Sequence, residues 1–144
     1  MFKSLVTEVL GVGAEPVESG ASLRDFEWKY RVLVIVQDKT GIEAAAQADS
    51  FMAQADALRE RDLVLISVAE TSARVLFGPT EALTTTHLDA GALLSDLDAA
   101  PGSFHIALIG KDGTVKLTSD RPVDPSSIFS RIDQMPMRKD EMRH

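Results

Sequence analysis

An uninterrupted aliphatic run at residues 32–36 constrains the fold more than any other feature of this chain. Every residue in it is aliphatic and most are β-branched. Such a run is typical of a strand buried on both faces of a largely parallel sheet. Residues 63–68 (LVLISV) form a second such run, so we expect a strand, a helix and a strand with a right-handed crossover. Trp28 and Tyr30, just upstream, are expected to cover the lower end of the sheet, because large aromatic side chains are mostly buried.

The segment between the two runs predicts one amphipathic helix. Thr40, with Glu43 three residues on, fits a capping box in which each side chain bonds a free backbone N–H group. The helix is expected to continue to about Arg61, with a single apolar stripe facing the sheet. The stripe consists of Ala48, Phe51, Met52, Ala55 and Leu58.

The carboxyl-terminal half predicts a short helix, a hairpin and a last helix. Asp89 is placed to cap the short helix. The Lys-Asp-Gly sequence at residues 111–113 predicts a tight turn, because Asp-Gly readily adopts the positive φ angles that such turns need. Asp124 followed by proline is typical of a helix start, and the charged tail from Arg138 onward is expected to be solvated. The hairpin strands are expected at residues 104–109 and 115–117.

Two stretches leave the organisation of the chain open. Residues 1–22 are interpreted as an N-terminal extension that packs across the domain or against a partner, and residues 23–144 as one domain. Residues 69–87 predict either a long loop or a small extra strand around residues 74–77.

Composition excludes several function classes. The net charge of −7 and the pI of about 4.9 disfavour binding to nucleic acid or anionic lipid. Because cysteine is absent, disulfides, thiolate metal sites and thiol oxidoreductase or peroxidase activity are excluded. No membrane span is indicated. The first 13 residues are a poor match to a secretory leader, so we expect a cytoplasmic protein, or a periplasmic or secreted one if a leader was removed.

The predicted order of elements, β-α-β-α-β-β-α, is the thioredoxin-like pattern of an α/β fold, with a mixed four-stranded sheet and helices on both faces. The segments WKYRVLVIV, ERDLVLISV, IALIGKDGTVKL and IFSRIDQMPMR resemble those of an uncharacterised bacterial domain family. That family is related to thioredoxin-like repeats of certain vertebrate secreted matrix proteins. The resemblance covers about residues 23–143 and implies a thioredoxin-like fold without an established activity. Some relatives are exported, which weakens the expectation of a cytoplasmic location.

Thioredoxins and peroxiredoxins keep their reactive cysteine in the loop and first helical turn after the first buried strand, here residues 38–43. That loop has no thiol, and the cis-proline of thioredoxins is missing near His105. If a site exists here, it would use Asp38, Thr40, Glu43 and His105. A carboxylate with a histidine can act as an acid/base pair or supply two metal ligands. Alternatively, Glu43 completes a cap, Asp38 is a turn residue and His105 is a strand residue with a satisfied hydrogen bond.

The leading interpretation is a non-catalytic module, without cofactor or metal, that binds another protein or itself. The alternative is a small-ligand binder or a non-redox enzyme that uses the loop at residues 38–43. Basic residues concentrate in the last third of the chain, which is typical of a solvated surface but can also attract an acidic partner or promote self-association. They are Lys111, Lys116, Arg121, Arg131, Arg138 and Arg143.

Overall fold

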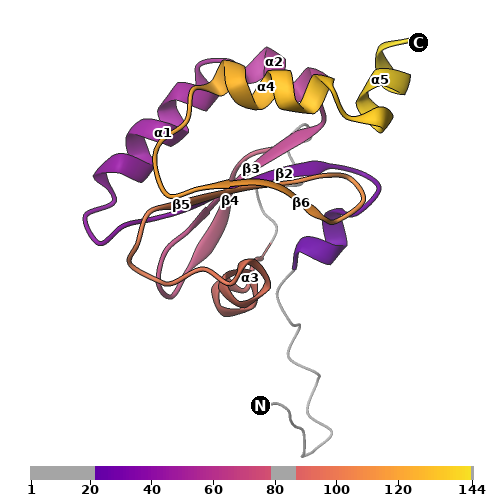
Figure 1. The fold of residues 1–144 in the computed structure, drawn as a ribbon. Coiled ribbons are helices and arrows are strands. Elements are labelled where there is room, and N and C mark those ends of the chain that lie inside the picture. Colours follow the sequence, from indigo (N-terminus) through magenta and orange to yellow (C-terminus); the bar gives the residue numbers. More distant parts are fainter. Residues whose placement is uncertain (1–21, 79–86, 144) are drawn as a thin grey trace, which may run out of the picture.

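Five strands form one mixed sheet with strand β2 at its centre (Figure 1). The computed structural model describes residues 22–78 and 87–143. The order across the sheet is β4-β3-β2-β5-β6; β2 runs parallel to β3 and antiparallel to β5. The strands are β2 (Arg31–Val36), β3 (Leu63–Val68), β4 (Ala73–Phe77), β5 (His105–Ile109) and β6 (Val115–Ser119).

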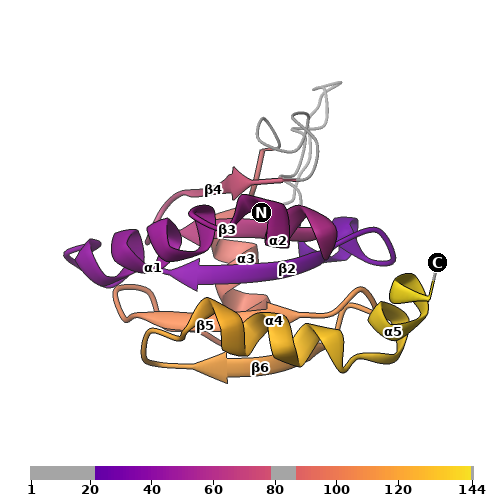
Figure 2. The same cartoon turned by 90° about the horizontal axis from the view of Figure 1, so that it is seen from above.

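Helices cover both faces of the sheet (Figure 1). Helices α1, α2 and α4 lie on one face, and α3 and the short 3-10 helix η1 lie on the other. Seen from above, α4 lies alongside α1 and α2, and α5 follows it at the end of the sheet (Figure 2). The helices are η1 (Leu23–Phe26), α1 (Ile42–Met52), α2 (Ala55–Glu60), α3 (Ala90–Leu97), α4 (Pro125–Asp133) and α5 (Pro136–Met142).

The core has two layers because β2 contributes alternate side chains to each face. Val32, Val34 and Val36 pack in a cluster with residues of α3 and η1. Leu33 and Ile35 pack in the other cluster, with residues of α1 and α4. The five aliphatic residues of β2 are buried, as the continuous run predicts for a central strand, and so is Arg31 at its start.

The sheet has one strand more than the four expected. The additional strand, β4, pairs antiparallel with β3 and occupies part of the segment 69–87, so the extra-strand alternative is confirmed for residues 73–77. Its burial pattern is mixed, which is usual at a sheet edge and explains why the sequence signal is weak. The expected N-terminal extension lies almost wholly outside the described residues.

The single helix expected up to Arg61 is two helices, interrupted at Ala53 and Gln54. Gln54 has φ −120° and ψ 46°, which is not helical. Phe51 and Leu58 are fully buried, whereas Met52, which was expected in the same stripe, is 42% exposed.

The expected capping box before α1 is wrong. Gly41, not Thr40, is the N-cap residue; its φ is 71°, and as a glycine it has no side chain to cap the helix. Thr40 Oγ1 instead accepts from the Ile42 N–H at 3.2 Å. The left-handed glycine turns the chain one residue later than the Thr-Glu spacing requires.

Three other local predictions are confirmed. The Asp89 side chain accepts from Ala92 N at 3.1 Å at the start of α3. Asp124 accepts from Ser126 N at 3.0 Å at the start of α4, where proline is the first helical residue. The β5–β6 hairpin turns through Gly113, whose φ is +83°.

Candidate functional site

Two of the four residues predicted to form a site meet at the carboxyl end of β2. Thr40 Oγ1 donates to Asp38 Oδ2 at 2.6 Å, and Asp38 Oδ1 accepts from Gly41 N at 3.1 Å. These bonds fix the turn into α1, so Asp38 serves as a turn residue. Glu43 is exposed in the first turn of α1.

His105 lies on the face of the sheet opposite α1. Its neighbour Ile106 packs in the cluster of α1, and successive strand residues point to opposite faces. His105 Nδ1 lies 2.9 Å from Asp120 Oδ1 at the end of β6. His105 Nε2 is buried and has no hydrogen-bond partner among the described residues. The structure therefore does not bring His105 to Glu43.

A hollow of about 420 Å³ does lie beside α1, but none of the four predicted residues lines it. Gln37, Gly41, Ser67 and Arg74 are among its lining residues. Within residues 22–78 and 87–143, no group of three or more histidine, aspartate or glutamate side chains is placed to hold a metal ion. The carboxyl end of β2 therefore offers no convergent set of reactive groups in the described part of the chain.

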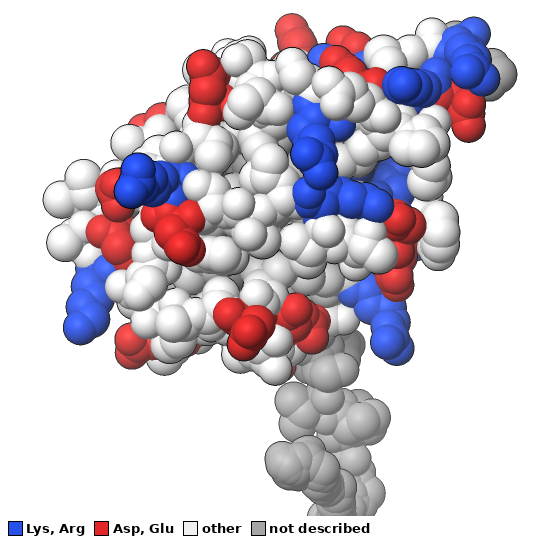
Figure 3. Space-filling model, in the orientation of Figure 1, with Lys and Arg blue, Asp and Glu red and all other residues white. Residues whose placement is uncertain are grey.

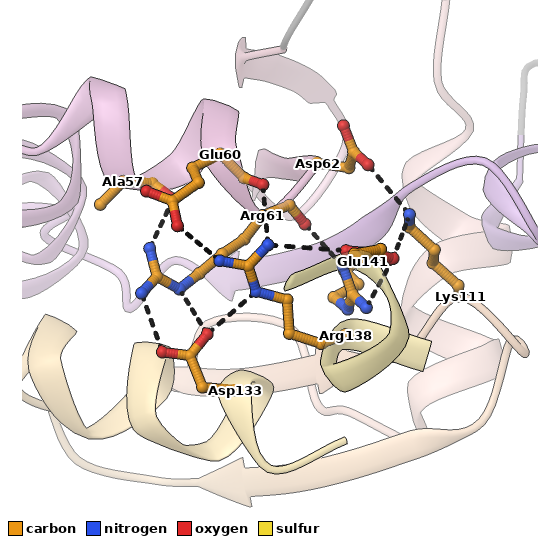
Figure 4. Close-up of polar contacts among 9 residues, drawn as sticks. Ala57, Glu60, Arg61, Asp62, Lys111, Asp133, Arg138 and Glu141 are labelled. Carbon is orange, nitrogen blue, oxygen red and sulfur yellow. Dashed lines mark hydrogen bonds and ion pairs between the residues drawn. The ribbon is translucent and has the colours of Figure 1, made fainter. Parts of the chain in front are cut away.

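A group of buried ion pairs lies at the opposite end of β2 (Figure 4). Arg31, the first residue of β2, is 1% exposed. Its two terminal nitrogens donate to the two carboxylate oxygens of Glu141 in α5, each at 3.1 Å. Lys111 Nζ donates to the same carboxylate at 2.7 Å and to Asp62 Oδ2 at 2.9 Å. Glu141 therefore neutralises two cations from distant parts of the chain.

Arg138 connects three helices beside these pairs. Its side chain is 4% exposed and donates to Glu60 Oε2 at 2.6 Å and to Asp133 Oδ1 at 3.0 Å. Arg61 donates to Asp133 Oδ2 at 2.9 Å, and its guanidinium lies 4.8 Å from the centre of the Phe129 ring. We call the whole set the ion-pair network. Its members are Arg31, Glu60, Arg61, Asp62, Lys111, Asp133, Arg138 and Glu141.

The network corrects the expectation of a solvated charged tail. Residues 136–142 form helix α5, and Arg138 in it is buried. Lys111, which was expected on a solvated surface, is also buried, at 9% exposure. A cation can be buried when carboxylates pair with it, and its partners here are distant in the sequence.

The network lowers the pKa of its central carboxylates. Burial is the largest influence on Glu141 and raises its pKa, but hydrogen bonds from Arg31 and Lys111 outweigh it, so the pKa lies below its ordinary value of 4.5. The same balance, with burial opposed by hydrogen bonds from two arginines, lowers the pKa of Asp133. Both groups are therefore charged throughout the neutral range.

We expect the free energy of unfolding to decrease in acid. The unfolded chain binds more protons than the folded one wherever a folded pKa is depressed, so stability present above the ordinary pKa is lost as the pH falls. The loss of stability should begin near pH 4.5, the ordinary pKa of a glutamate such as Glu141. It should continue toward pH 2, because hydrogen bonds from Lys116 and then Thr114 lower the pKa of Asp112 to about 2. Urea unfolding at a series of pH values measures it. The Asp140→Asn variant, which removes an exposed carboxylate from α5, should keep the same pH dependence. A constant free energy over this range would contradict the ion pairing.

A second hollow, of about 580 Å³, adjoins the network, and we call it the basic hollow. Trp28 stands at it and is 66% exposed, contrary to the expectation that this aromatic is buried. Tyr30, by contrast, packs partly buried against the core. The start of α5 at residues 135–137 supplies further apolar lining. Its charged lining consists of Arg31, Lys111, Lys116, Arg131 and Asp112.

Most of the residues that sequence reasoning missed lie in the segments on which the family resemblance rests, but Glu141 lies just beyond the last of them. Residues 28–31, 60–62, 110–113 and 135–138 come from four different segments, and all four contribute to the network or to the basic hollow. A signal was present in two of them, because Arg31 directly precedes the aliphatic run at residues 32–36 and Asp62 directly precedes β3. No single segment shows which charged residues pair with one another in the folded chain.

Comparison with known proteins gives a family but no function. Residues 22–141 match the family described as "Domain of unknown function (DUF4174)". No curated protein matches, and no solved structure matches. In the described part of the chain, no helix has both the length and the apolar character needed to cross a membrane.

Proposed function

The chain belongs to the DUF4174 family, a domain family of unknown function, and from this premise we propose that it is a non-catalytic protein-interaction module with a thioredoxin-like fold. The strand order supports the fold proposal. Strands β3, β2, β5 and β6 are neighbours in that order, with β3 and β2 parallel and the last two strands forming an antiparallel hairpin. The edge strand β4 is an addition to that pattern.

The observation that carries the proposal is the position of Trp28. It is the only tryptophan in the chain, and two thirds of it is exposed. Its backbone has φ 69°, a left-handed conformation that costs a non-glycine residue of the order of 1 kcal/mol. Its N–H group donates to the carbonyl oxygen of Lys111 at 2.6 Å, which holds it in place. Tryptophan is enriched among the residues that dominate protein interfaces, so an outward, fixed tryptophan supports binding.

The other end of β2 supports the non-catalytic part of the proposal. The side chains of Asp38 and Thr40 bond each other and the local backbone, as turn residues do. His105 pairs with Asp120 on the opposite face of the sheet from α1. An acid/base mechanism needs these groups within hydrogen-bond reach of one substrate, and their arrangement does not supply that.

We expect a photoreactive residue placed at position 28 to cross-link the partner in the source cells. The partner can be a different protein or a second copy of this chain. A cross-link at position 28 should be followed by mass-spectrometric identification and a binding assay with the purified partner. In that assay, Trp28→Ala should weaken binding by about tenfold or more, because truncating a central interface tryptophan commonly costs over about 1.4 kcal/mol.

Ile42 provides the matched control. It is also a large exposed apolar residue, at 72%, but it lies at the start of α1, by the other end of β2. Cross-linking at 28 and not at 42, with Ile42→Ala binding normally, supports the proposal. Cross-linking at 42 alone, or a stoichiometric small molecule retained in native mass spectrometry, overturns it and returns attention to the loop at residues 38–43.

A further inference from the structure

We propose that the basic hollow binds an acidic segment of a partner protein that also carries apolar side chains. The inference rests on the proposed function, because it specifies the chemistry of the partner. The hollow is lined by a tryptophan, two methionines at the start of α5 and cations, and its volume of about 580 Å³ is within the usual range of ligand pockets.

The charge of the lining is opposite to that of the whole chain. Four cationic side chains and one carboxylate line the hollow, in a chain whose net charge is −7. Glu141 and Asp62, the carboxylates that pair with Arg31 and Lys111, are not among the lining residues. Figure 3 shows basic side chains gathered in the upper middle of this face, with acidic side chains at the right-hand edge of the group. Carboxylates pair with Arg31, Lys111 and Lys116, so the uncompensated charge of the lining is that of Arg131, and it favours an anionic group.

Arg131 is the lining cation whose side chain is most free to bind a ligand. It is exposed, and its guanidinium donates to the carbonyl oxygen of Lys116 at 2.9 Å. Within residues 22–78 and 87–143, no carboxylate forms an ion pair with it. An arginine fork binds a carboxylate through two parallel hydrogen bonds, so Arg131 can hold an acidic side chain. Lys116, paired with Asp112 at 2.9 Å, lies beside it.

Arg31 adds an unsatisfied donor to the inner wall. The residue is 1% exposed, and its Nε has no hydrogen-bond partner among the described residues. A buried donor without a partner is costly, so this end of β2 carries one polar group that the described residues leave unsatisfied. This donor is independent of the exposed cations at the rim.

The apolar lining decides between a peptide and a free anion. Trp28 is 66% exposed and Met137 is 38% exposed, and both line the hollow. A small anion would pair with the cations but leave these two side chains in water. A segment with both acidic and apolar side chains covers both, and methionine adapts its shape to varied partners.

The test uses Trp28 as the reporter, since it is the only tryptophan of the chain. The probe is a synthetic peptide of alternating glutamate and leucine residues, added to the full chain while tryptophan emission is recorded. We expect a saturable change in emission. A peptide with glutamine in place of glutamate should bind about tenfold more weakly or worse, because the carboxylates carry the attraction.

Paired variants locate the site. Lys116→Gln together with Arg131→Gln should weaken binding of the acidic peptide by about tenfold. Lys39→Gln together with Arg121→Gln removes the same charge from exposed positions that do not line the hollow, and should leave binding unchanged. Unchanged urea unfolding of each variant shows that it is folded.

Three results would overturn the inference: no emission change with the acidic peptide, an equal loss in both paired variants, or the same change with inorganic phosphate or succinate alone. The last result identifies a small anion as the occupant. If a partner cross-links at position 28 but acidic peptides do not bind, the proposed function stands and only this inference fails.

Discussion

Replacing Glu141 with glutamine should lower the free energy of unfolding by about 3 kcal/mol. Among the described residues, Glu141 is the one carboxylate that contacts both Arg31, which is 1% exposed, and Lys111, which is 9% exposed. Its loss leaves two buried cations with too little negative charge. Removing one partner of a buried pair usually costs about 3 to 5 kcal/mol, and we expect the lower end because Glu141 itself is 26% exposed. Urea unfolding at neutral pH measures the change.

Asp140→Asn is the matched control for this variant. Asp140 precedes Glu141 in α5 and pairs with Arg143, but both side chains are more than two thirds exposed. Exposed pairs contribute about 0 to 1 kcal/mol, so this variant should unfold almost like the original chain. Adding Arg31→Met to Glu141→Gln should recover much of the loss, because the uncompensated buried charge is removed. Equal, small losses for Glu141→Gln and Asp140→Asn would show that α5 is not held by the network.

Replacing Phe51 with alanine should lower the free energy of unfolding by about 4 kcal/mol. The Phe51 side chain is fully buried between the sheet and α4. Its ring packs edge-to-face on Phe129, with ring centres 6.1 Å apart. The substitution removes a large apolar surface and leaves a cavity, and both effects destabilise the fold. Thermal or urea unfolding gives the value directly.

The adjacent residue is the control for Phe51. Met52→Ala removes a side chain that is 42% exposed, so the expected loss is within about 0.5 kcal/mol. The sequence pattern had assigned both residues to the buried stripe, whereas the structure separates them. Comparable losses in the two variants would mean that the helix faces the sheet as the pattern predicted.

The elements that sequence reasoning predicted well depend on local chemistry. Strand β2 follows from its aliphatic run, and the hairpin follows from the Asp-Gly pair at its turn. The starts of α3 and α4 follow from Asp89 and Asp124, whose side chains each accept a backbone N–H bond. In each case the residues that specify the element lie within or next to it.

The parts that were missed depend on contacts between distant residues. Arg31 looks like a surface residue in the sequence, and its burial requires Glu141, 110 positions later. The exposed Trp28 follows from its left-handed backbone and its bond to Lys111, which periodicity does not show. The predicted site also depended on a distant contact. The face of the sheet on which His105 lies is set by the register of β5 on β2.

The bond between Arg31 and Glu141 also has a consequence for folding during synthesis, because its two residues are made at different times. A ribosome makes Arg31 well before Glu141, so the nascent chain holds the central strand long before its charge partner exists. During that interval, burial of Arg31 would leave its charge without its Glu141 partner, so we expect that end of the strand to stay hydrated. We therefore expect closure of this end of the domain to follow translation of α5, whereas the pairing of β2 with β3 needs only residues that are made earlier.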